Sequence, residues 1–395
     1  MSKTHRMPRV WLALAGGLAA LGVVAAEQEI TITRTTGIGE TPPILIALEG
    51  YTGEVAEVLE FDLEVVGFKV VPRSDPKLEW VLAGANAGRV EGRLRDAVSG
   101  AEKLARAYSG GSLRLQAHAL ADDVVKTVLG LPGIARTRIA FKRDLGRASE
   151  IYVADYDGYN ATAVTRDGSV VAAPDWAPGR KLLVYTTYLA GNADIVAHDL
   201  TTGRRTYVAR YTGSNMSPAV SPDGRRVAMI LSKGGSPDLY VANLDGSHLR
   251  QLTKTPVDES SPCWSPDGRT ICFSTRMGGR RTLATIPAEG GQVRRLRTAG
   301  AVNPSEPAWS PDGRWIAFTA QRGGFEICVV PAGGGTARTV AVGEDPSWSP
   351  NSRTLIHVVR DRQGGRSLSV LDVLTKQRKT LRTGLGSCSQ PAWAR

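Results

Sequence analysis

Carboxylate and amide side chains recur in the sequence just before copies of a Pro-x-Trp tripeptide or its variant. Clustered carboxylates could hold a cation, and polar side chains in loops could also bind another protein. The acidic residues have no EF-hand-like spacing, so a solvated loop or a protein-binding surface is the better interpretation. The residues in question are Asn215, Asp258, Glu259, Asn303, Glu306, Glu344 and Gln390.

Motifs for catalysis are missing from the sequence. There is no G-x-S-x-G nucleophile elbow, no P-loop and no dinucleotide-binding fingerprint. His118, on a predicted amphipathic helix, has no partner at triad spacing, and we interpret it as a packing or surface residue. The repeated Pro-x-Trp segments carry Pro, Ala, Ser and Trp rather than converging charged residues. We therefore expect a protein that is not an enzyme, with no cofactor and no metal.

From residue 136 onward the chain repeats itself with a period of about 44 residues. Each unit opens with Pro-x-Trp or a variant, continues with two short apolar segments and closes with a more polar one. Each of these segments predicts a β-strand, and four-stranded units at this period are typical of a β-propeller. The prolines that open the units are Pro174, Pro218, Pro262, Pro307, Pro346 and Pro391.

A Ser-Pro-Asp-Gly turn follows the Pro-x-Trp segment in three units, at 221–224, 265–268 and 310–313. Proline sets φ at the second turn position, and glycine relieves crowding at the fourth. Degenerate copies stand at 177–180 and 349–352. Five such turns at a constant spacing indicate repeated hairpins, because one tetrapeptide alone would mean little.

The two ends of the repeat array are incomplete in complementary ways. Residues 138–166 contain three predicted strands without a Pro-x-Trp strand, and the chain ends on "SQPAWAR" at 389–395. Joined around a ring, the two ends complete one blade and pair strand edges that would otherwise be open. The sequence therefore predicts six blades, with the propeller closed by a C-terminal strand in the first blade.

The segments before the repeats predict a signal peptide and a small domain. A basic start and an apolar run over 10–26 fit a secretory signal peptide at 1–26, with a retained membrane anchor as the alternative. Residues 27–133 predict an α/β N-terminal domain, with strands near 29–35 and 43–48 and helices near 52–67 and 112–133. The propeller then covers 134–395.

The distribution of charge and the spacing of cysteines argue against a nucleic-acid-binding protein and against a cysteine metal site. After signal removal 46 basic residues face 38 acidic ones, but the arginines are scattered and do not form a nucleic-acid-binding stripe. Cys263, Cys272, Cys328 and Cys388 lack metal-site spacing, so we interpret them as small buried side chains. A Cys263–Cys272 bridge across one predicted hairpin stays open.

Specific motifs resemble a known family. The stretch "RTRIAF" followed by "DYDGYN", within 133–164, is similar to the propeller entry of the TolB family, the periplasmic component of the Tol–Pal envelope system. The resemblance continues through the repeats to the final "PAW" and weakly back to "EITITRTTGIGE". It departs from the family pattern at the turns 177–180 and 349–352 and between Pro72 and Gly111.

The resemblance implies a fold and a role. It implies an α/β domain before a six-bladed propeller, in a monomeric, non-catalytic periplasmic adaptor that maintains outer-membrane integrity and invagination during division. It also implies that the propeller binds the lipoprotein Pal, for which the seven loop residues above form the expected mouth. The mature N-terminal segment would bind TolA, and other outer-membrane proteins are possible partners. That segment includes Glu29, Ile30, Thr31, Ile32, Thr33 and Arg34.

Two alternatives remain open at the level of sequence. One is an exported propeller that binds carbohydrate or other envelope proteins. The other is a propeller-based lyase or hydrolase, which would need charged or histidine side chains to converge from several innermost strands.

Overall fold

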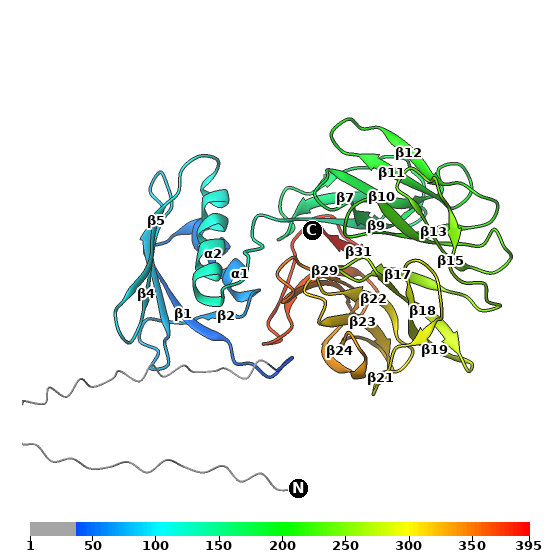
Figure 1. The fold of residues 1–395 in the computed structure, drawn as a ribbon. Helices are drawn as coiled ribbons and strands as arrows, with labels where there is room; N and C mark the ends of the chain where they lie inside the picture. The colour runs from blue at the N-terminus through cyan, green and yellow to red at the C-terminus, as the bar shows by residue number, and fades with distance from the viewer. Residues whose placement is uncertain (1–36) are drawn as a thin grey trace, which may run out of the picture. The chain divides into compact units, whose positions relative to one another are not determined.

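A computed structural model describes residues 37–395 of the chain (Figure 1). The predicted signal peptide, the predicted strand at 29–35 and the expected TolA-binding residues lie outside this described part. None of the helices formed by residues 37–395 is long and apolar enough to cross a membrane.

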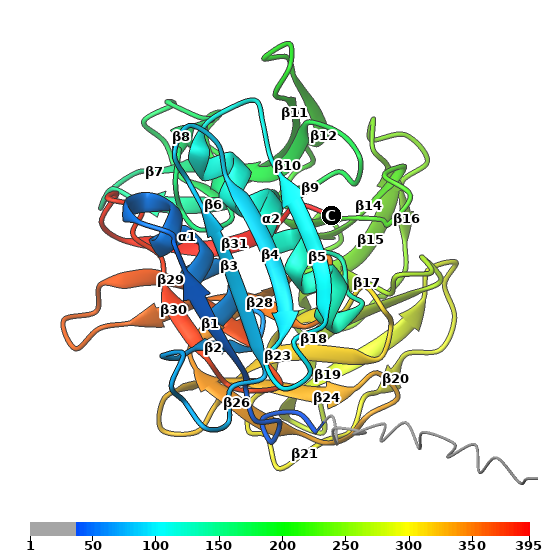
Figure 2. The same ribbon diagram turned by 90° about the vertical axis from the view of Figure 1, so that its left-hand side faces the viewer.

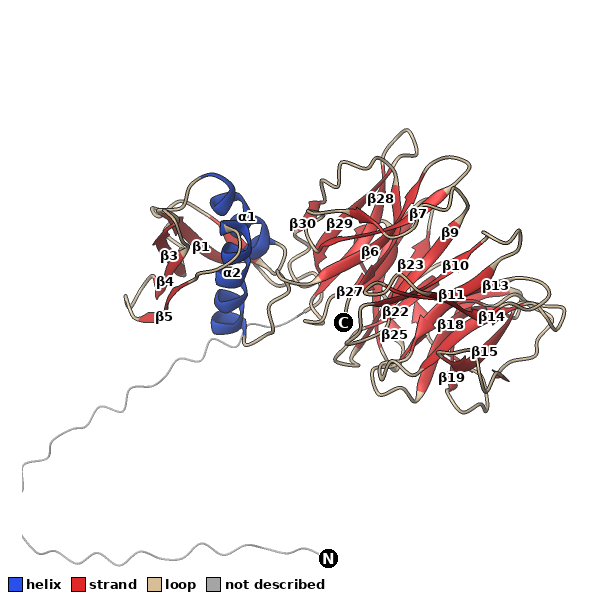
Figure 3. Cartoon of the chain, turned by 90° about the horizontal axis from the view of Figure 1, so that it is seen from above, coloured by secondary structure: helices blue, strands red, loops and turns tan. Residues whose placement is uncertain are grey.

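The first part of the described chain forms a five-stranded sheet with two helices. The strand order is β2-β1-β3-β4-β5, with β1 parallel to β2 and β3 and the remaining neighbours antiparallel. Both helices cover the same face of this sheet (Figures 2 and 3). The elements are β1 (Ile44–Glu49), α1 (Gly53–Glu64), β2 (Phe68–Val70), β3 (Trp80–Ala85), β4 (Glu91–Asp96), β5 (Glu102–Ala107) and α2 (Leu113–Leu129).

The two helices form where the apolar spacing predicted them. In α1, Val55, Val58 and Leu59 are buried at helical spacing against the sheet. Helix α2 begins after Ser112, whose Oγ accepts a hydrogen bond from the Leu115 amide. It ends at Gly130, whose φ of 67° is the left-handed conformation that closes many helices.

Residues 138–395 form six four-stranded antiparallel sheets, as predicted. Numbered as blades, with the innermost strand first, blade 1 is β31 (Cys388–Trp393), β6 (Arg138–Asp144), β7 (Ser149–Asp155) and β8 (Thr162–Ala163). Blade 2 is β9 (Val171–Trp176), β10 (Leu182–Thr187), β11 (Asp194–Asp199) and β12 (Arg205–Ala209). Blade 3 is β13 (Asn215–Val220), β14 (Arg226–Leu231), β15 (Asp238–Asn243) and β16 (Arg250–Gln251).

The last three blades follow the same plan. Blade 4 is β17 (Ser260–Trp264), β18 (Thr270–Met277), β19 (Arg280–Pro287) and β20 (Arg294–Arg295). Blade 5 is β22 (Ser305–Trp309), β23 (Trp315–Gln321), β24 (Phe325–Pro331) and β26 (Arg338–Val342). Blade 6 is β27 (Glu344–Trp348), β28 (Thr354–Arg360), β29 (Arg366–Asp372) and β30 (Arg378–Thr380). A two-stranded pair, β21 (Thr298–Ala299) and β25 (Gly335–Thr336), joins the rims of blades 4 and 5.

The C-terminal strand closes the ring inside the first blade, which confirms the predicted seam. Strand β31 pairs antiparallel with β6, with Trp393 opposite Ile139 and Cys388 opposite Arg143. In Figure 1 the red C-terminal strand lies beside β9 of the following blade. Because β6 finds its inner partner only at the end of the chain, the last residues complete the sheet instead of forming a tail.

Tryptophans of the innermost strands connect neighbouring blades. The indole Nε1 atoms of Trp176, Trp264 and Trp348 each donate a hydrogen bond to a carbonyl of the preceding blade, at 3.2, 2.9 and 3.0 Å. The acceptors are the middle residues of the preceding Pro-x-Trp or Pro-Ala-Val segment, Ala392, Ala219 and Ala308. Each indole thus packs between two sheets while its single polar atom is satisfied.

The repeated turns have the predicted geometry. In the copies that begin at Ser221, Ser265 and Ser310, the serine hydroxyl donates to the aspartate two residues later, at 2.5–2.6 Å. The closing glycines have φ of 67–75°. In the degenerate copy, Ser349 donates to Asn351 in the same way, and Ser352 takes the left-handed conformation in place of glycine.

A buried polar network differs from the expectation for His118. Its Nδ1 lies 2.7 Å from the Asp62 carboxylate, and its Nε2 lies 3.6 Å from Asp157. Tyr156, at the end of the first propeller hairpin, also donates to Asp62. His118 is therefore a buried member of a polar network between the helices and blade 1. The sequence does not predict this network, because Asp62 and Tyr156 are far from His118 along the chain.

Candidate functional site: the channel of the propeller

The innermost strands of all six blades line one central cavity of about 510 Å³. Every blade contributes an X-Pro pair to its wall. The pairs are Ala173-Pro174, Ser217-Pro218, Ser261-Pro262, Glu306-Pro307, Asp345-Pro346 and Gln390-Pro391. The repeat in sequence thus becomes a ring in space, in which equivalent residues face a common channel.

The residue before each of these prolines has an unusual backbone. All six have φ between 49° and 54°, although none is glycine. In each blade a register shift between the first and second strands includes this residue. A left-handed residue before proline costs free energy, on the order of 1–3 kcal/mol, and such strain persists only where the surroundings hold it. The bulge turns these side chains out of the ladder and into the channel wall.

Hydrogen bonds between blades hold part of this ring. The Glu306 carboxylate accepts from the backbone amide of Asp345 at 3.2 Å and from the Thr319 hydroxyl at 2.6 Å. The Asp345 carboxylate accepts from the amide of Gln390 at 3.2 Å. The side-chain oxygen of Gln390 accepts from the amide of Ala173 at 2.9 Å. Side-chain oxygens of blades 5, 6 and 1 therefore each accept a hydrogen bond from a backbone amide of the next blade, ending at blade 2.

The opposite half of the ring has small side chains. Blades 2, 3 and 4 contribute Ala173, Ser217 and Ser261 at the equivalent position. The amide of Ser217 is held by the Thr186 hydroxyl at 3.2 Å, and the Ser261 side chain has no hydrogen-bond partner within residues 37–395. At the position before the proline, the channel wall therefore carries acidic and amide side chains in blades 5, 6 and 1 and small side chains in blades 2, 3 and 4.

Burial controls the charge of this wall. Burial, with help from nearby Glu306 and Glu344, holds the pKa of Asp345 well above its ordinary value. Burial likewise raises the pKa of Asp175, whose carboxylate accepts a 2.7 Å hydrogen bond from the amide of Val220 in the next blade. These carboxyls act as hydrogen-bonding groups that join blades, and no histidine of residues 37–395 lines the cavity.

This finding corrects one expectation. The innermost strands were predicted to lack charged residues, yet Glu306 lies within β22, Asp345 within β27 and Asp175 within β9. The strands begin two or three residues before the landmark proline, so residues expected in loops, such as Glu306, belong to the channel wall. Asp175 is the middle residue of its own Pro-x-Trp landmark.

The structure separates the seven predicted loop residues into distinct environments. Glu306 and Gln390 line the channel together. Asn303 lines two adjoining hollows between blades 4 and 5, and Asp258 is exposed in the loop before β17. Only two of the seven side chains therefore meet in the channel.

The other three predicted residues are buried: Asn215 and Glu259 bond to groups of the preceding blade, and Glu344 bonds to an arginine of its own blade. The Asn215 amide donates to the carbonyls of Ala193 and Tyr211, at 2.8 and 2.9 Å. The Glu259 carboxylate accepts from the Thr253 hydroxyl and the Leu239 amide, and Glu344 forms a bidentate ion pair with Arg360, at 2.8 and 2.7 Å.

Sequence reasoning missed four channel residues. Ala173, Ser217, Ser261 and Asp345 occupy the same position as Glu306 and Gln390, immediately before the proline of the landmark. That proline was the available signal, because a fixed spacing from it identifies the ring position in every blade.

The fold and the channel define a class of protein: a six-bladed β-propeller, preceded by an α/β domain, with a channel wall of polar and small side chains. The profile of the TolB beta propeller domain matches residues 125–395. The chain belongs to the TolB propeller family, as its motifs suggested.

Similar proteins agree with this assignment. The Tol-Pal system protein TolB of Anaeromyxobacter sp. strain K is 33% identical over 286 residues, covering 62% of this chain and 65% of that protein. That of Francisella tularensis strain WY96-3418 is 33% identical over 150 residues, 36% of this chain and 34% of that protein. The match therefore spans about a third of the length of the Francisella relative.

Solved structures support the fold. The crystal structure of TolB from Acinetobacter baumannii matches with a TM-score of 0.80 at 22% identity, covering 90% of this chain and 98% of that one. A chain of the nidogen/laminin complex matches with a TM-score of 0.55 at 13% identity, covering 66% of this chain and 98% of that one. A propeller alone does not define a function, since such different proteins share it.

Proposed function

We propose that this chain is a non-catalytic periplasmic adaptor of the Tol–Pal system that links the lipoprotein Pal to inner-membrane TolA. In this role it maintains outer-membrane integrity and invagination during cell division. The observation that carries the proposal is the family match across the whole propeller. The channel agrees with a binding role, because it presents hydrogen-bonding groups on a rigid wall and lacks an activated nucleophile–base pair.

Pal is proposed to bind where the left-handed residues meet at the channel mouth. Glu306, Asp345 and Gln390 offer polar groups there, and Ser261 leaves room on the opposite side. A partner of ordinary size buries about 800 Å² on each side, so residues of several blades must contribute. Asp258 and Asn303, in the loops around the mouth, are further candidates for contact.

The test uses a bulky side chain that removes no internal hydrogen bond. Ser261→Arg fills the open side of the mouth, and Thr206→Arg on exposed strand β12 is the matched control. We expect Ser261→Arg to weaken binding of the soluble domain of cognate Pal by about tenfold or more in calorimetry, with the control unchanged. Undiminished binding by Ser261→Arg, combined with loss in Arg225→Glu on the turn side, would place Pal on the other face.

The proposed TolA-binding segment comprises Glu29 to Arg34, directly before the described residues. The first described residues dock on the propeller: the amide of Gly39 donates to the Val373 carbonyl at 2.9 Å, and Ile38 is buried among residues of blades 5 and 6. A deletion for testing TolA binding should therefore stop before Ile38, so that this docked contact remains.

Deletion of residues 27–35 should abolish binding of the cognate TolA domain, whereas Pal binding persists. A chain in which residues 27–35 are scrambled controls for length and composition. If the deleted or scrambled chain binds TolA with unchanged affinity, the segment is not the TolA site. The thermal midpoint of each variant shows whether the docked contact of Gly39 is intact.

A further inference from the structure

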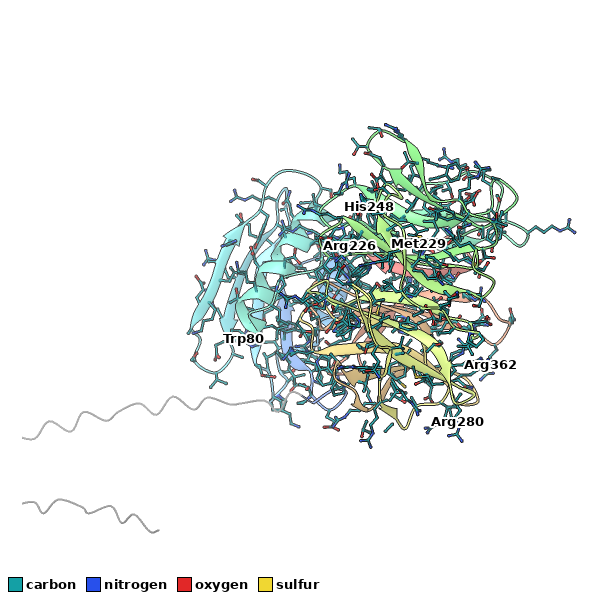
Figure 4. The ribbon with its side chains drawn as sticks, turned by 45° about the vertical axis from the view of Figure 1, so that its right-hand side comes forward. Trp80, Arg226, Met229, His248, Arg280 and Arg362 are labelled. Atoms are coloured by element: carbon teal, nitrogen blue, oxygen red, sulfur yellow. The ribbon has the colours of Figure 1, made fainter. Side chains whose placement is uncertain are left out.

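Two adjoining hollows lie between blades 4 and 5, apart from the central channel. Their volumes are about 740 and 350 Å³, and both are lined by Arg281 and Asn303. The β18–β19 hairpin forms one wall, and the segment 295–304, between β20 and β22, forms another. We refer to the two hollows together as the arginine cleft. Arg280 stands at the edge of the propeller, with its side chain directed away from the ribbon (Figure 4).

The arginine cleft carries positive charge without compensation. Among the described residues, its lining includes five arginines and no aspartate or glutamate. Within residues 37–395, none of the five side chains has an ion-pair or hydrogen-bond partner. The five are Arg276, Arg280, Arg281, Arg295 and Arg297.

Some arginines elsewhere on the propeller are paired with carboxylates. Arg226 and Arg250 share the carboxylate of Glu289, at 2.7 and 2.8 Å. Arg353 is paired with Asp372 at 2.5 Å. Arginines without a partner inside residues 37–395, such as Arg204 and Arg382, also occur elsewhere. The arginine cleft differs because five of them line adjoining hollows.

Strand register places two of these charges directly opposite each other. Arg276 of β18 is the cross-strand partner of Arg281 of β19, and both line the smaller hollow. Like charges at such positions destabilise a sheet. A bound anion would remove the repulsion between Arg276 and Arg281, so the pair fits a site that binds anions.

The segment 295–304, which forms one wall of the arginine cleft, is held in place by the two-stranded pair β21–β25. Strand β21 pairs with β25, and the Gly335 amide donates to the Arg297 carbonyl at 2.8 Å. Gly334 has φ of 84°, and a Cβ there would lie 3.0 Å from the Arg297 amide nitrogen. The backbone that carries Arg297 is thus fixed against blade 5, and the site is preorganised.

We propose that the arginine cleft binds a ligand that bears phosphate groups. Guanidinium groups match phosphate oxygens with paired N–H donors. The side chains of Thr298 and Asn303 supply neutral donors that have no hydrogen-bond partner among residues 37–395. A phosphate monoester carries about 1.5 to 2 negative charges, so two or three groups balance five arginines. An acidic peptide would need about five carboxylates in the same space.

The test reverses charge inside and outside the arginine cleft. Arg281→Glu combined with Arg297→Glu reverses two positive charges inside the arginine cleft. Arg204→Glu combined with Arg382→Glu makes the same change in net charge at exposed arginines elsewhere that have no ion-pair partner in the described part of the chain. The probes are inorganic pyrophosphate and polyglutamate by calorimetry and phosphatidylglycerol vesicles by co-sedimentation, with phosphatidylcholine vesicles as the neutral surface. None of the four side chains holds the fold, and thermal midpoints confirm that each variant is folded.

We expect the cleft variant to lose at least about tenfold in affinity while the control keeps most of its binding, because charge-assisted hydrogen bonds are lost only in the cleft. The charge-conserving pair Arg281→Lys and Arg297→Lys should bind with intermediate affinity. Binding of pyrophosphate alone identifies a soluble phosphate ester, and binding of both probes identifies a lipid headgroup. The proposal is overturned by equal losses in both charge-reversal variants, by absence of binding to either probe, or by tighter binding of polyglutamate than of pyrophosphate.

Discussion

The indole Nε1 of Trp393 donates a 2.8 Å hydrogen bond to Oγ1 of Thr137, which lies 256 residues earlier in the chain. Thr137 directly precedes β6, and Trp393 is 2% exposed near the end of β31. The contact joins the first and last residues of the propeller, so the first blade is complete only when both ends of the repeat array are in place.

Deletion of residues 389–395 should therefore unfold the propeller. Trp393→Ala alone should lower the free energy of unfolding by about 3–5 kcal/mol, because it removes a buried indole that packs in the core shared by the helices and blade 1. Thr137→Val removes only the hydrogen bond, at a cost of about 1 kcal/mol. Chemical denaturation of the three variants measures these effects. An unchanged thermal midpoint in the deletion variant would contradict the closure by β31.

Glu259 should make stability fall as pH rises. Burial raises its pKa to about 7 from an ordinary value of 4.5. The folded state holds this proton more tightly than the unfolded state, so the contribution is complete below pH 4.5 and is lost as pH rises through 7. The loss amounts to at most about 3 kcal/mol. Glu259→Gln cannot titrate, and its curve of unfolding free energy against pH should lack this decline. Parallel curves for both proteins would contradict the buried carboxyl.

His357 should have the opposite effect. It is fully buried in β28, and burial lowers its pKa from 6.5 to about 4. The unfolded state binds this proton more tightly, so stability is complete above pH 6.5 and is lost as pH falls toward 4, by about 3 kcal/mol at most. His357→Leu should be less sensitive to acid than the parent between pH 6.5 and 4, measured by denaturant titration. If the variant loses as much stability as the parent over this range, the ring is not buried in neutral form.

The buried pair of Arg353 and Asp372 should matter far more than an exposed pair. Asp372 is fully buried and also accepts from the Thr375 hydroxyl at 2.6 Å. Asp372→Asn leaves Arg353 without its counter-charge, and we expect a cost of about 3–5 kcal/mol. The exposed carboxylate of Glu289 provides the control, because Glu289→Gln should cost less than about 1 kcal/mol. The free energy of unfolding of both variants is measured by denaturant titration. Equal losses in the two variants would show that burial does not increase the cost of breaking the ion pair.

The repeat architecture was predictable because it depends on local chemistry. Proline, glycine and the Ser–Asp pair specify the hairpin turns near Ser221, Ser265 and Ser310 without help from distant residues. The spacing of apolar segments specified four strands in each unit. The closure of the ring could be predicted by counting strands. The final Pro-Ala-Trp strand lacks the other three strands of a blade, and the strand that begins at Arg138 lacks a preceding Pro-x-Trp strand.

By itself, the sequence determined the six blades, their closure by the last strand, and the α/β fold before them, because turn chemistry and hydrophobic period are properties of neighbouring residues. Only the tertiary structure decided which polar side chains face the channel. Glu306 lies one residue before its landmark proline and lines the wall. Glu259 lies three residues before its landmark proline and is buried, where it accepts a hydrogen bond from the Thr253 hydroxyl. The structure likewise brings together Arg281 of β19 and Arg297 of the segment between β20 and β21. Such outcomes depend on the bulge in each innermost strand and on contacts between blades, which no local pattern records.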